Sequence, residues 1–117
     1  MEIIVQKYGG TSLATPNHLL RVAHRIMAIR KEGRGVIAVV SAMGDTTDNL
    51  IALAHQVSLK PEPREMDVLL STGELVSSAL LAITLNAQGC DAISMSGAQA
   101  GIRTSSVFRG AQIQTID

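Results

Sequence analysis

The stretch Ile3-Ile4-Val5-Gln6-Lys7-Tyr8-Gly9-Gly10-Thr11-Ser12 decides the fold expected of this chain. Its β-branched start predicts a strand, and the glycine pair directly after it predicts a tight turn. Lys7 lies where the strand ends, and the two glycines let backbone amides approach an anion closely, with the hydroxyls of Thr11 and Ser12 beside them. The pattern favours a phosphate-binding turn with its own cation. The alternative is a strand-end lysine in a hydrophilic turn.

The next segment predicts a helix followed by a second strand. Thr15 and Pro16 form a helix start, and apolar residues recur behind them at helical spacing: Leu19, Val22, Ala23, Ile26 and Met27. Gly33-Arg34-Gly35 ends the helix. The uninterrupted apolar run Val36–Val40 is typical of a parallel strand covered on both faces. We therefore expect a right-handed βαβ unit and an α/β fold with a mainly parallel sheet.

The second predicted strand ends at another loop of small polar residues, 41–47. Ligands of open α/β sheets gather beyond the carboxyl ends of the strands, so Lys7 and Ser41 should project toward one crevice. Asp45 or Thr46 would begin the next helix, and residues 58–64, with two prolines, would form a loop.

The second half of the chain predicts more helix and then strands. Residues 65–88 have helical periodicity, and the glycine in Thr72-Gly73-Glu74 indicates a break into two helical pieces. Glu74 alone would be read as a partner of a helix dipole. Residues 91–95 predict a third strand before the small-residue loop 96–101, and residues 102–117 predict short strands or a hairpin.

Composition narrows the class of protein. The 117 residues are 46% apolar and 17% charged, which is typical of a globular domain. Ten basic and ten acidic residues cancel, and no basic run with aromatic residues indicates a nucleic-acid partner. The single Cys90 allows no internal disulfide, and no Cys and His cluster has metal-ligand spacing. We see no leader peptide and no apolar run long enough for a membrane span, so we expect a soluble cytoplasmic protein that binds neither membrane nor metal.

Three motifs occur in order: Lys7-Tyr8-Gly9-Gly10-Thr11-Ser12, then Ser41–Asp48, then Ser71-Thr72-Gly73-Glu74. Together with Ser94–Gly101 they closely resemble the amino-terminal part of aspartate kinases, which are members of the amino acid kinase superfamily. The first motif is shared in looser form with glutamate 5-kinases, acetylglutamate kinases and uridylate kinases. The resemblance implies the three-layer sandwich of the carbamate kinase-like fold, with this chain forming its amino-terminal portion.

The resemblance also implies roles for these residues. The family would use Lys7 as a catalytic cation on the phosphates of ATP, within a nucleotide-binding stretch formed by Lys7, Tyr8, Gly9, Gly10, Thr11 and Ser12. Ser41 and Thr47 match positions that contact L-aspartate, and Glu74 matches the residue that pairs with its α-ammonium group. The γ-phosphoryl group would pass to the side-chain carboxylate, giving 4-phospho-L-aspartate for lysine, threonine and methionine biosynthesis. Mg²⁺ would arrive with the nucleotide.

The family pattern continues beyond what can be placed on this chain. Aspartate kinases have a second half of the kinase domain, which bears the catalytic aspartate and most of the adenine site, followed by regulatory ACT domains. We therefore expect residues 1–117 to be the amino-terminal part of a kinase domain, inactive alone, in a protein that forms homo-oligomers. Two alternatives remain: a non-catalytic fragment that binds or self-associates, and another amino acid kinase with a different acceptor.

Overall fold

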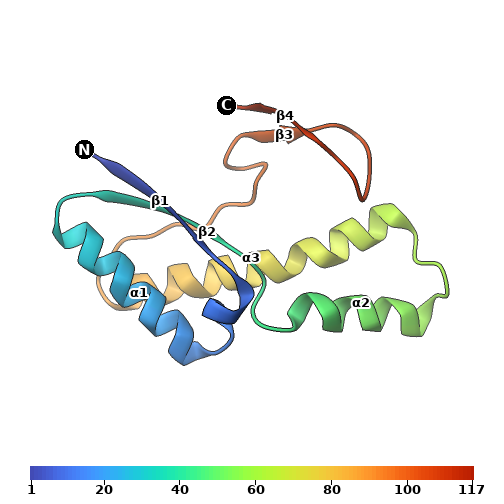
Figure 1. The fold of residues 1–117 in the computed structure, drawn as a ribbon, viewed down its shortest axis with the longest axis horizontal. Coiled ribbons are helices and arrows are strands. Elements are labelled where there is room, and N and C mark those ends of the chain that lie inside the picture. The colour runs from blue at the N-terminus through green and yellow to red at the C-terminus, as the bar shows by residue number, and fades with distance from the viewer.

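The computed structural model describes residues 1–117 and has the expected alternation of strands and helices (Figure 1). The elements follow in this order: β1 (Ile3–Tyr8), a short 3-10 helix η1 (Gly10–Leu13), α1 (Pro16–Lys31), β2 (Gly35–Val40), α2 (Thr46–Val57), α3 (Pro63–Ala87), β3 (Ile102–Thr104) and β4 (Ile113–Ile116). The predicted α/β class is confirmed.

β1 and β2 form a two-stranded parallel sheet, with partners running from Ile3↔Gly35 to Tyr8↔Val40. The crossover between them is α1, so the predicted βαβ unit is confirmed. Thr15 caps this helix, because its hydroxyl oxygen accepts a hydrogen bond from the backbone N–H of His18 at 3.3 Å, and Pro16 follows in the first turn. Both strands end at the same edge of the sheet.

The hydrophobic core lies between one face of this sheet and the helices. Its buried members come from β1, η1, α1 and α3: Tyr8, Leu13, Leu19, Val22, Ala23, Ile26, Leu81 and Leu85. Burying a side chain of this size stabilises a fold by about 1.5–3 kcal/mol. The apolar stripe predicted for α1 is therefore its packing face.

The opposite face of the sheet is uncovered, contrary to the expectation from the apolar run of β2. Ile3 and Val5 of β1 and Ile37 and Val39 of β2 are each about half exposed, at 57%, 64%, 52% and 48%. These side chains share one face because alternate residues of a strand point the same way, and Val5 is paired with Ile37. Within these residues the helices cover only the other face (Figure 1).

α3 is one continuous helix, so the predicted break at Gly73 is wrong. Gly73 is buried, and a Cβ placed on it would lie 2.9 Å from the Cβ of Ala42. The glycine therefore permits close approach of α3 to the loop after β2. Glycine within a helix interior costs only about 1 kcal/mol relative to alanine, which 25 residues of helix tolerate.

α3 also corrects the expectation about membrane spans. It has an 18-residue window with a mean hydropathy of 1.8, and 22% of that window is buried. By length and composition this one helix could cross a bilayer, although core helices meet the same criteria. Its Leu81 and Leu85 are buried in the core described above.

The predicted third strand, residues 91–95, is not formed. The segment is held to the end of α3 instead, because the Asn86 side chain accepts from the Ala92 N–H at 2.8 Å and donates to its carbonyl oxygen at 3.2 Å. Ile93 in the middle of the segment is 80% exposed. Only β1 and β2 therefore make up the parallel sheet.

The hairpin expected near the end of the chain is confirmed. β3 and β4 are antiparallel, from Ile102↔Ile116 to Thr104↔Ile113, with an irregularity between Arg103 and Thr104. The loop between them reaches α3, where the backbone N–H of Arg109 donates to a carboxylate oxygen of Asp67 at 3.0 Å. The hairpin thus arches away from the sheet and returns to the helix layer (Figure 1).

Candidate functional site

The glycine turn after β1 is shaped by its contact with the loop after β2. A Cβ on Gly10 would lie 2.9 Å from the carbonyl oxygen of Ala42 and 3.3 Å from that of Gly44, whereas a Cβ on Gly9 would meet nothing within 4 Å. The Gly10 carbonyl oxygen also accepts a hydrogen bond from the Gly44 N–H at 3.0 Å. The two glycines thus differ: Gly10 is required by packing, and Gly9 leaves an exposed, open backbone.

The loop of residues 41–44 lies between this turn and α3. Its first backbone N–H, from Ser41, donates to the Tyr8 carbonyl oxygen at 3.1 Å and continues the pairing of the strands. On its other side the carbonyl oxygen of Ser41 accepts a 2.6 Å hydrogen bond from Ser77 Oγ. Ala42 is buried against Gly73. Three segments far apart in the sequence therefore meet at the carboxyl edge of the sheet.

Ser77 is a site residue that the sequence reasoning missed. Its side chain is fully buried, and the same hydroxyl is within 3.1 Å of the Glu74 carbonyl oxygen. Its position in the sequence could have indicated that it is buried. The buried residues of α3 recur every fourth residue along one face of the helix: Gly73, Ser77, Leu81 and Leu85. A small polar residue in that row indicates a buried polar partner.

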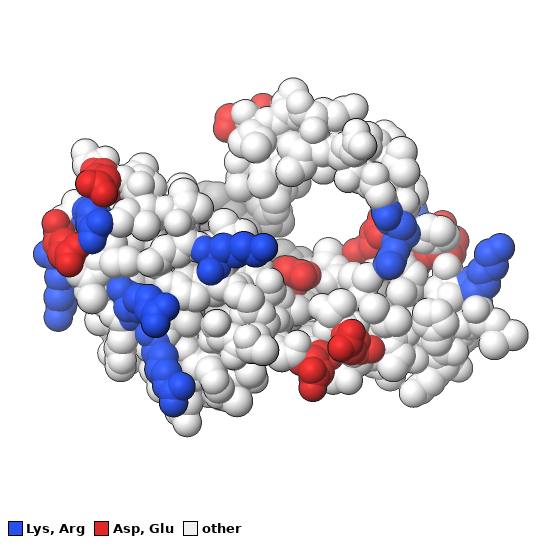
Figure 2. Space-filling model, viewed as in Figure 1, with Lys and Arg blue, Asp and Glu red and all other residues white.

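Glu74 is positioned by the residues on either side of it in the helix. Gly73 and Ser77 fix this turn of α3 against the loop after β2, and Glu74 itself is exposed. Lys7, the only basic residue of β1, is also exposed and is paired with Val39 near the end of the sheet. In Figure 2 basic atoms over the end of β1 lie beside acidic atoms over the middle of α3.

The remaining predicted site residues lie around this contact. Thr11 and Ser12 are in η1 and are exposed, and Thr47 is half-buried in the first turn of α2. Thr46, the first residue of α2, donates from Oγ1 to the Met43 carbonyl oxygen at 2.6 Å.

Tyr8 differs from its neighbours because its side chain is buried in the core. Its hydroxyl donates a short hydrogen bond to the side-chain oxygen of Gln6. Burial raises the pKa of the Tyr8 phenol, and the neighbouring Arg25 guanidinium partly opposes that rise. The Tyr8 side chain is therefore part of the core, and its carbonyl oxygen is already bonded to the Ser41 N–H.

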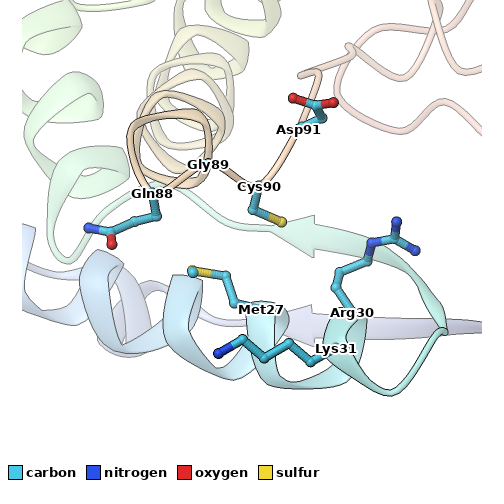
Figure 3. Close-up of a pocket in the computed structure, with 7 residues that line it drawn as sticks. All are labelled: Met27, Arg30, Lys31, Gln88, Gly89, Cys90 and Asp91. Atoms are coloured by element: carbon cyan, nitrogen blue, oxygen red, sulfur yellow. The ribbon is translucent and has the colours of Figure 1, made fainter.

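A cavity of about 390 Å³ lies elsewhere (Figure 3). It is lined by the end of α1 and the turn after α3: Met27, Arg30, Lys31, Gln88, Gly89, Cys90 and Asp91. Arg30 is engaged with the Arg34 carbonyl oxygen at 2.9 Å, and Figure 3 shows Asp91 pointing away from Lys31. This is also the edge at which β2 begins, opposite to the edge where ligands of parallel sheets bind.

No group of three or more His, Cys, Asp or Glu side chains is arranged to hold a metal ion. The carboxylates near the contact of the three segments, Asp45, Asp48 and Glu74, do not form such a group.

Comparison with known proteins matches residues 2–116 to the amino acid kinase family. Aspartokinase from Bacillus sp. (strain MGA3) is 52% identical over all 117 residues, and aspartokinase from Mycolicibacterium smegmatis is 50% identical over 113 residues. The chain spans 28% and 27% of the length of these two relatives.

A solved structure agrees with these relatives. The crystal structure of aspartate kinase from Synechocystis superposes with a TM-score of 0.81 at 52% sequence identity, over 86% of this chain and 17% of that one. Both the sequence and the arrangement of its strands and helices thus place this chain in the amino acid kinase family.

Proposed function

We propose that this chain supplies the amino-terminal part of the active site of an ATP-dependent aspartate kinase. The observation that carries the proposal is the three-way contact at the carboxyl edge of the sheet. There the loop that begins at Ser41 is hydrogen-bonded on one side to the glycine turn and on the other to Ser77 of α3, and its Ala42 packs against Gly73. The 52% identity to an aspartokinase supports the choice of substrate class.

In this proposal the glycine turn and Lys7 hold the phosphates of ATP. Gly9 is open to a ligand, and Thr11 and Ser12 are exposed beside it. Phosphoryl transfer spreads negative charge over the oxygens of the transferred group, so a fixed ammonium and fixed amides stabilise the transition state without a covalent intermediate. Lys7 is the catalytic residue of this chain, and Mg²⁺ is bound through the nucleotide.

L-Aspartate binds in this proposal next to the same edge. Ser41 and Thr47 contact the amino acid, and the Glu74 carboxylate pairs with its α-ammonium group, for which an acceptor-only side chain is suited. The close contact of Gly73 with Ala42 matters here, because it places Glu74 relative to the loop that carries Ser41. A displacement of that loop would then weaken aspartate binding and phosphoryl transfer together.

The remainder of the active site is proposed to lie outside these 117 residues. The chain spans 28% of the relative's length, and the sheet face formed by Ile3, Val5, Ile37 and Val39 is uncovered. We propose that further residues of a kinase domain cover this face in a cytoplasmic homo-oligomer, with regulatory domains beyond it. That face also supports the second candidate, a catalytically inactive fragment that self-associates through it.

A chimera tests the function directly. This chain replaces the matching segment of the Bacillus sp. aspartokinase, and product is trapped as aspartyl hydroxamate in the presence of ATP and Mg²⁺. We expect turnover by the chimera and none by the 117 residues alone. Product from the chain alone would overturn the proposal that the missing part is needed.

Variants of the chimera test the individual roles. Lys7→Ala should lower kcat by about 10²-fold or more with little change in KM for aspartate, as for other losses of transition-state charge stabilisation. Glu74→Gln should raise KM for aspartate. If the native chimera and its Glu74→Gln variant used an acceptor without an α-ammonium group equally well, another kinase of the family would be favoured instead.

A further inference from the structure

A second cavity lies on the helix-covered side of the glycine turn. It has a volume of about 180 Å³ and is lined by the end of β1, by η1 and by one face of α1: Tyr8, Ser12, His18, Arg21, Val22 and Arg25. The three α1 residues that can carry positive charge, His18, Arg21 and Arg25, are spaced three and four residues apart and so share a helix face.

This cavity is separate from the proposed position of Lys7. Adjacent residues of a strand point to opposite faces of the sheet, and Tyr8 is buried on the side of α1. Lys7 therefore lies on the uncovered face with Val39, and its side chain does not line the cavity. The turn that follows β1 is shared by two sites, one on each side.

The charges around the cavity are unbalanced. No Asp or Glu lines it, and neither Arg21 nor Arg25 has a carboxylate oxygen within 4.0 Å, although four ion pairs form elsewhere in the chain. Figure 2 shows basic side chains, with no acidic side chain between them, over the half of α1 that lies nearer η1. A concave surface with charge of one sign concentrates ions of the opposite sign.

The donors in the cavity fit one ligand chemistry. A guanidinium presents its N–H groups in a planar fork that matches the oxygens of phosphate or carboxylate, and a serine hydroxyl adds a donor from the opposite wall. The volume is well below the 300 Å³ or so at which pockets for whole drug-sized molecules begin. It has room for a tetrahedral oxyanion, such as a single phosphoryl group, and is too small for an entire nucleotide.

We propose that Ser12, Arg21 and Arg25 form a binding site for a phosphate-type oxyanion on the helix-covered side of the glycine turn. The oxyanion contacts the two guanidinium groups and the Ser12 hydroxyl, with His18 at the rim. Because the turn is shared, occupancy of this site would order the backbone on which the nucleotide is proposed to bind. The proposal does not rest on kinase activity, since its probe is inorganic phosphate.

The test is a titration of the isotope-labelled chain with inorganic phosphate at constant ionic strength, followed by the backbone amide resonances. We expect saturable shifts at Ser12, His18, Arg21 and Arg25. Arg21→Gln should weaken binding by about fivefold or more, as expected for loss of a charge-assisted hydrogen bond. Arg64→Gln removes the same charge from an exposed position on α3 and is the matched control.

The outcomes separate specific binding from general attraction of anions. Shifts that do not saturate, or equal weakening by the Arg21 and Arg64 variants, would overturn the proposal. Arg21→Lys keeps the charge and loses the fork, so binding between that of the native chain and Arg21→Gln supports a guanidinium contact. An unchanged amide spectrum away from the cavity shows that each variant remains folded.

The source of the oxyanion is decided by competition. If ATP displaces phosphate from these residues, the site takes a phosphoryl group of the nucleotide; if both bind together, it takes a free oxyanion. Lys7→Ala should leave phosphate binding unchanged in either case. Loss of phosphate binding in Lys7→Ala would show that phosphate binds at Lys7 and not in this cavity, which would overturn the assignment without bearing on catalysis by the chimera.

Discussion

Ser77 Oγ donates a 2.6 Å hydrogen bond to the carbonyl oxygen of Ser41, 36 residues earlier in the chain. The bond joins the middle of α3 to the end of β2, and Ser77 is inaccessible to solvent. A buried carbonyl that loses its donor retains the full cost of its desolvation. This contact therefore couples the long helix to the edge of the sheet at which the proposed site lies.

Ser77→Ala should lower the free energy of unfolding by about 1–3 kcal/mol, because it leaves the Ser41 carbonyl oxygen without this partner. Urea denaturation measures the change. Ser78→Ala is the matched control, since the Ser78 hydroxyl bonds only to the Leu75 carbonyl oxygen of its own helix. Equal losses in the two variants would show that the bond to Ser41 contributes nothing specific.

The two neighbouring glycines of the turn should respond differently to alanine. Gly10→Ala places a Cβ 2.9 Å from the Ala42 carbonyl oxygen, which is backbone and cannot move aside cheaply, so we expect destabilisation of about 1–3 kcal/mol. Gly9→Ala meets no atom within 4 Å, and Gly9 has an extended backbone with φ −79°. Its thermal unfolding midpoint should stay close to that of the native chain.

Gly73→Ala should destabilise the chain even though alanine is the better helix former. The new methyl group would lie 2.9 Å from Ala42 Cβ, so α3 would have to move away from the loop after β2. The double variant Gly73→Ala with Ala42→Gly removes that contact and should recover part of the lost stability. Denaturant midpoints of the native chain, the two single variants and the double variant complete this cycle, and absence of recovery would contradict the close-approach explanation.

The same glycine explains how far sequence reasoning could go. A βαβ unit follows from the apolar runs 3–5 and 36–40 and from the cap at Thr15, because those signals are local. A glycine within helical periodicity has two meanings, a break or a close approach, and only the partner decides between them. Ala42, the partner of Gly73, is 31 positions away, so no local pattern could identify it.

Other differences between the sequence-based predictions and the structure also arise from contacts that a local sequence pattern does not show. Residues 91–95 have a strand-like composition, yet side-chain bonds from Asn86 hold the segment to the end of α3. The burial of Ser77 depends on Ser41, and the exposure of Ile37 depends on the absence of a second covering layer from these residues. The motif positions could be predicted because each follows a strand end or a helix turn; the contacts among them could not.

The hairpin should detach from α3 when its anchor is removed. Asp67→Ala deletes the acceptor of the Arg109 N–H, and we expect faster amide exchange at Arg109 with little change in the core. Arg109 has φ 64°, a left-handed conformation that costs energy for a residue with a side chain, so the anchor opposes local strain. Glu65→Ala, also on α3, is the control, and equal exchange in both variants would contradict the role of Asp67.

Tyr8 provides a pH-dependent readout of the core. Its pKa is raised above the ordinary value of 10.0 chiefly by burial, so the folded chain holds the phenolic proton more tightly than the unfolded chain does. The resulting stability is complete below pH 10 and is lost as the pH rises through the higher pKa of the folded state. The free energy of unfolding, measured at a series of pH values, should therefore decrease as the pH rises above 10.

The titration of Tyr8 can be followed without interference from other phenols, because the chain contains one tyrosine. Phenolate absorbance therefore follows Tyr8 alone. Arg25→Gln removes the cation that opposes the shift, so the Tyr8 pKa should rise further, whereas Arg64→Gln should leave it unchanged. A fall of the Tyr8 pKa in Arg25→Gln would mean that the phenol has become exposed to water, and that Arg25 acts mainly by covering the ring.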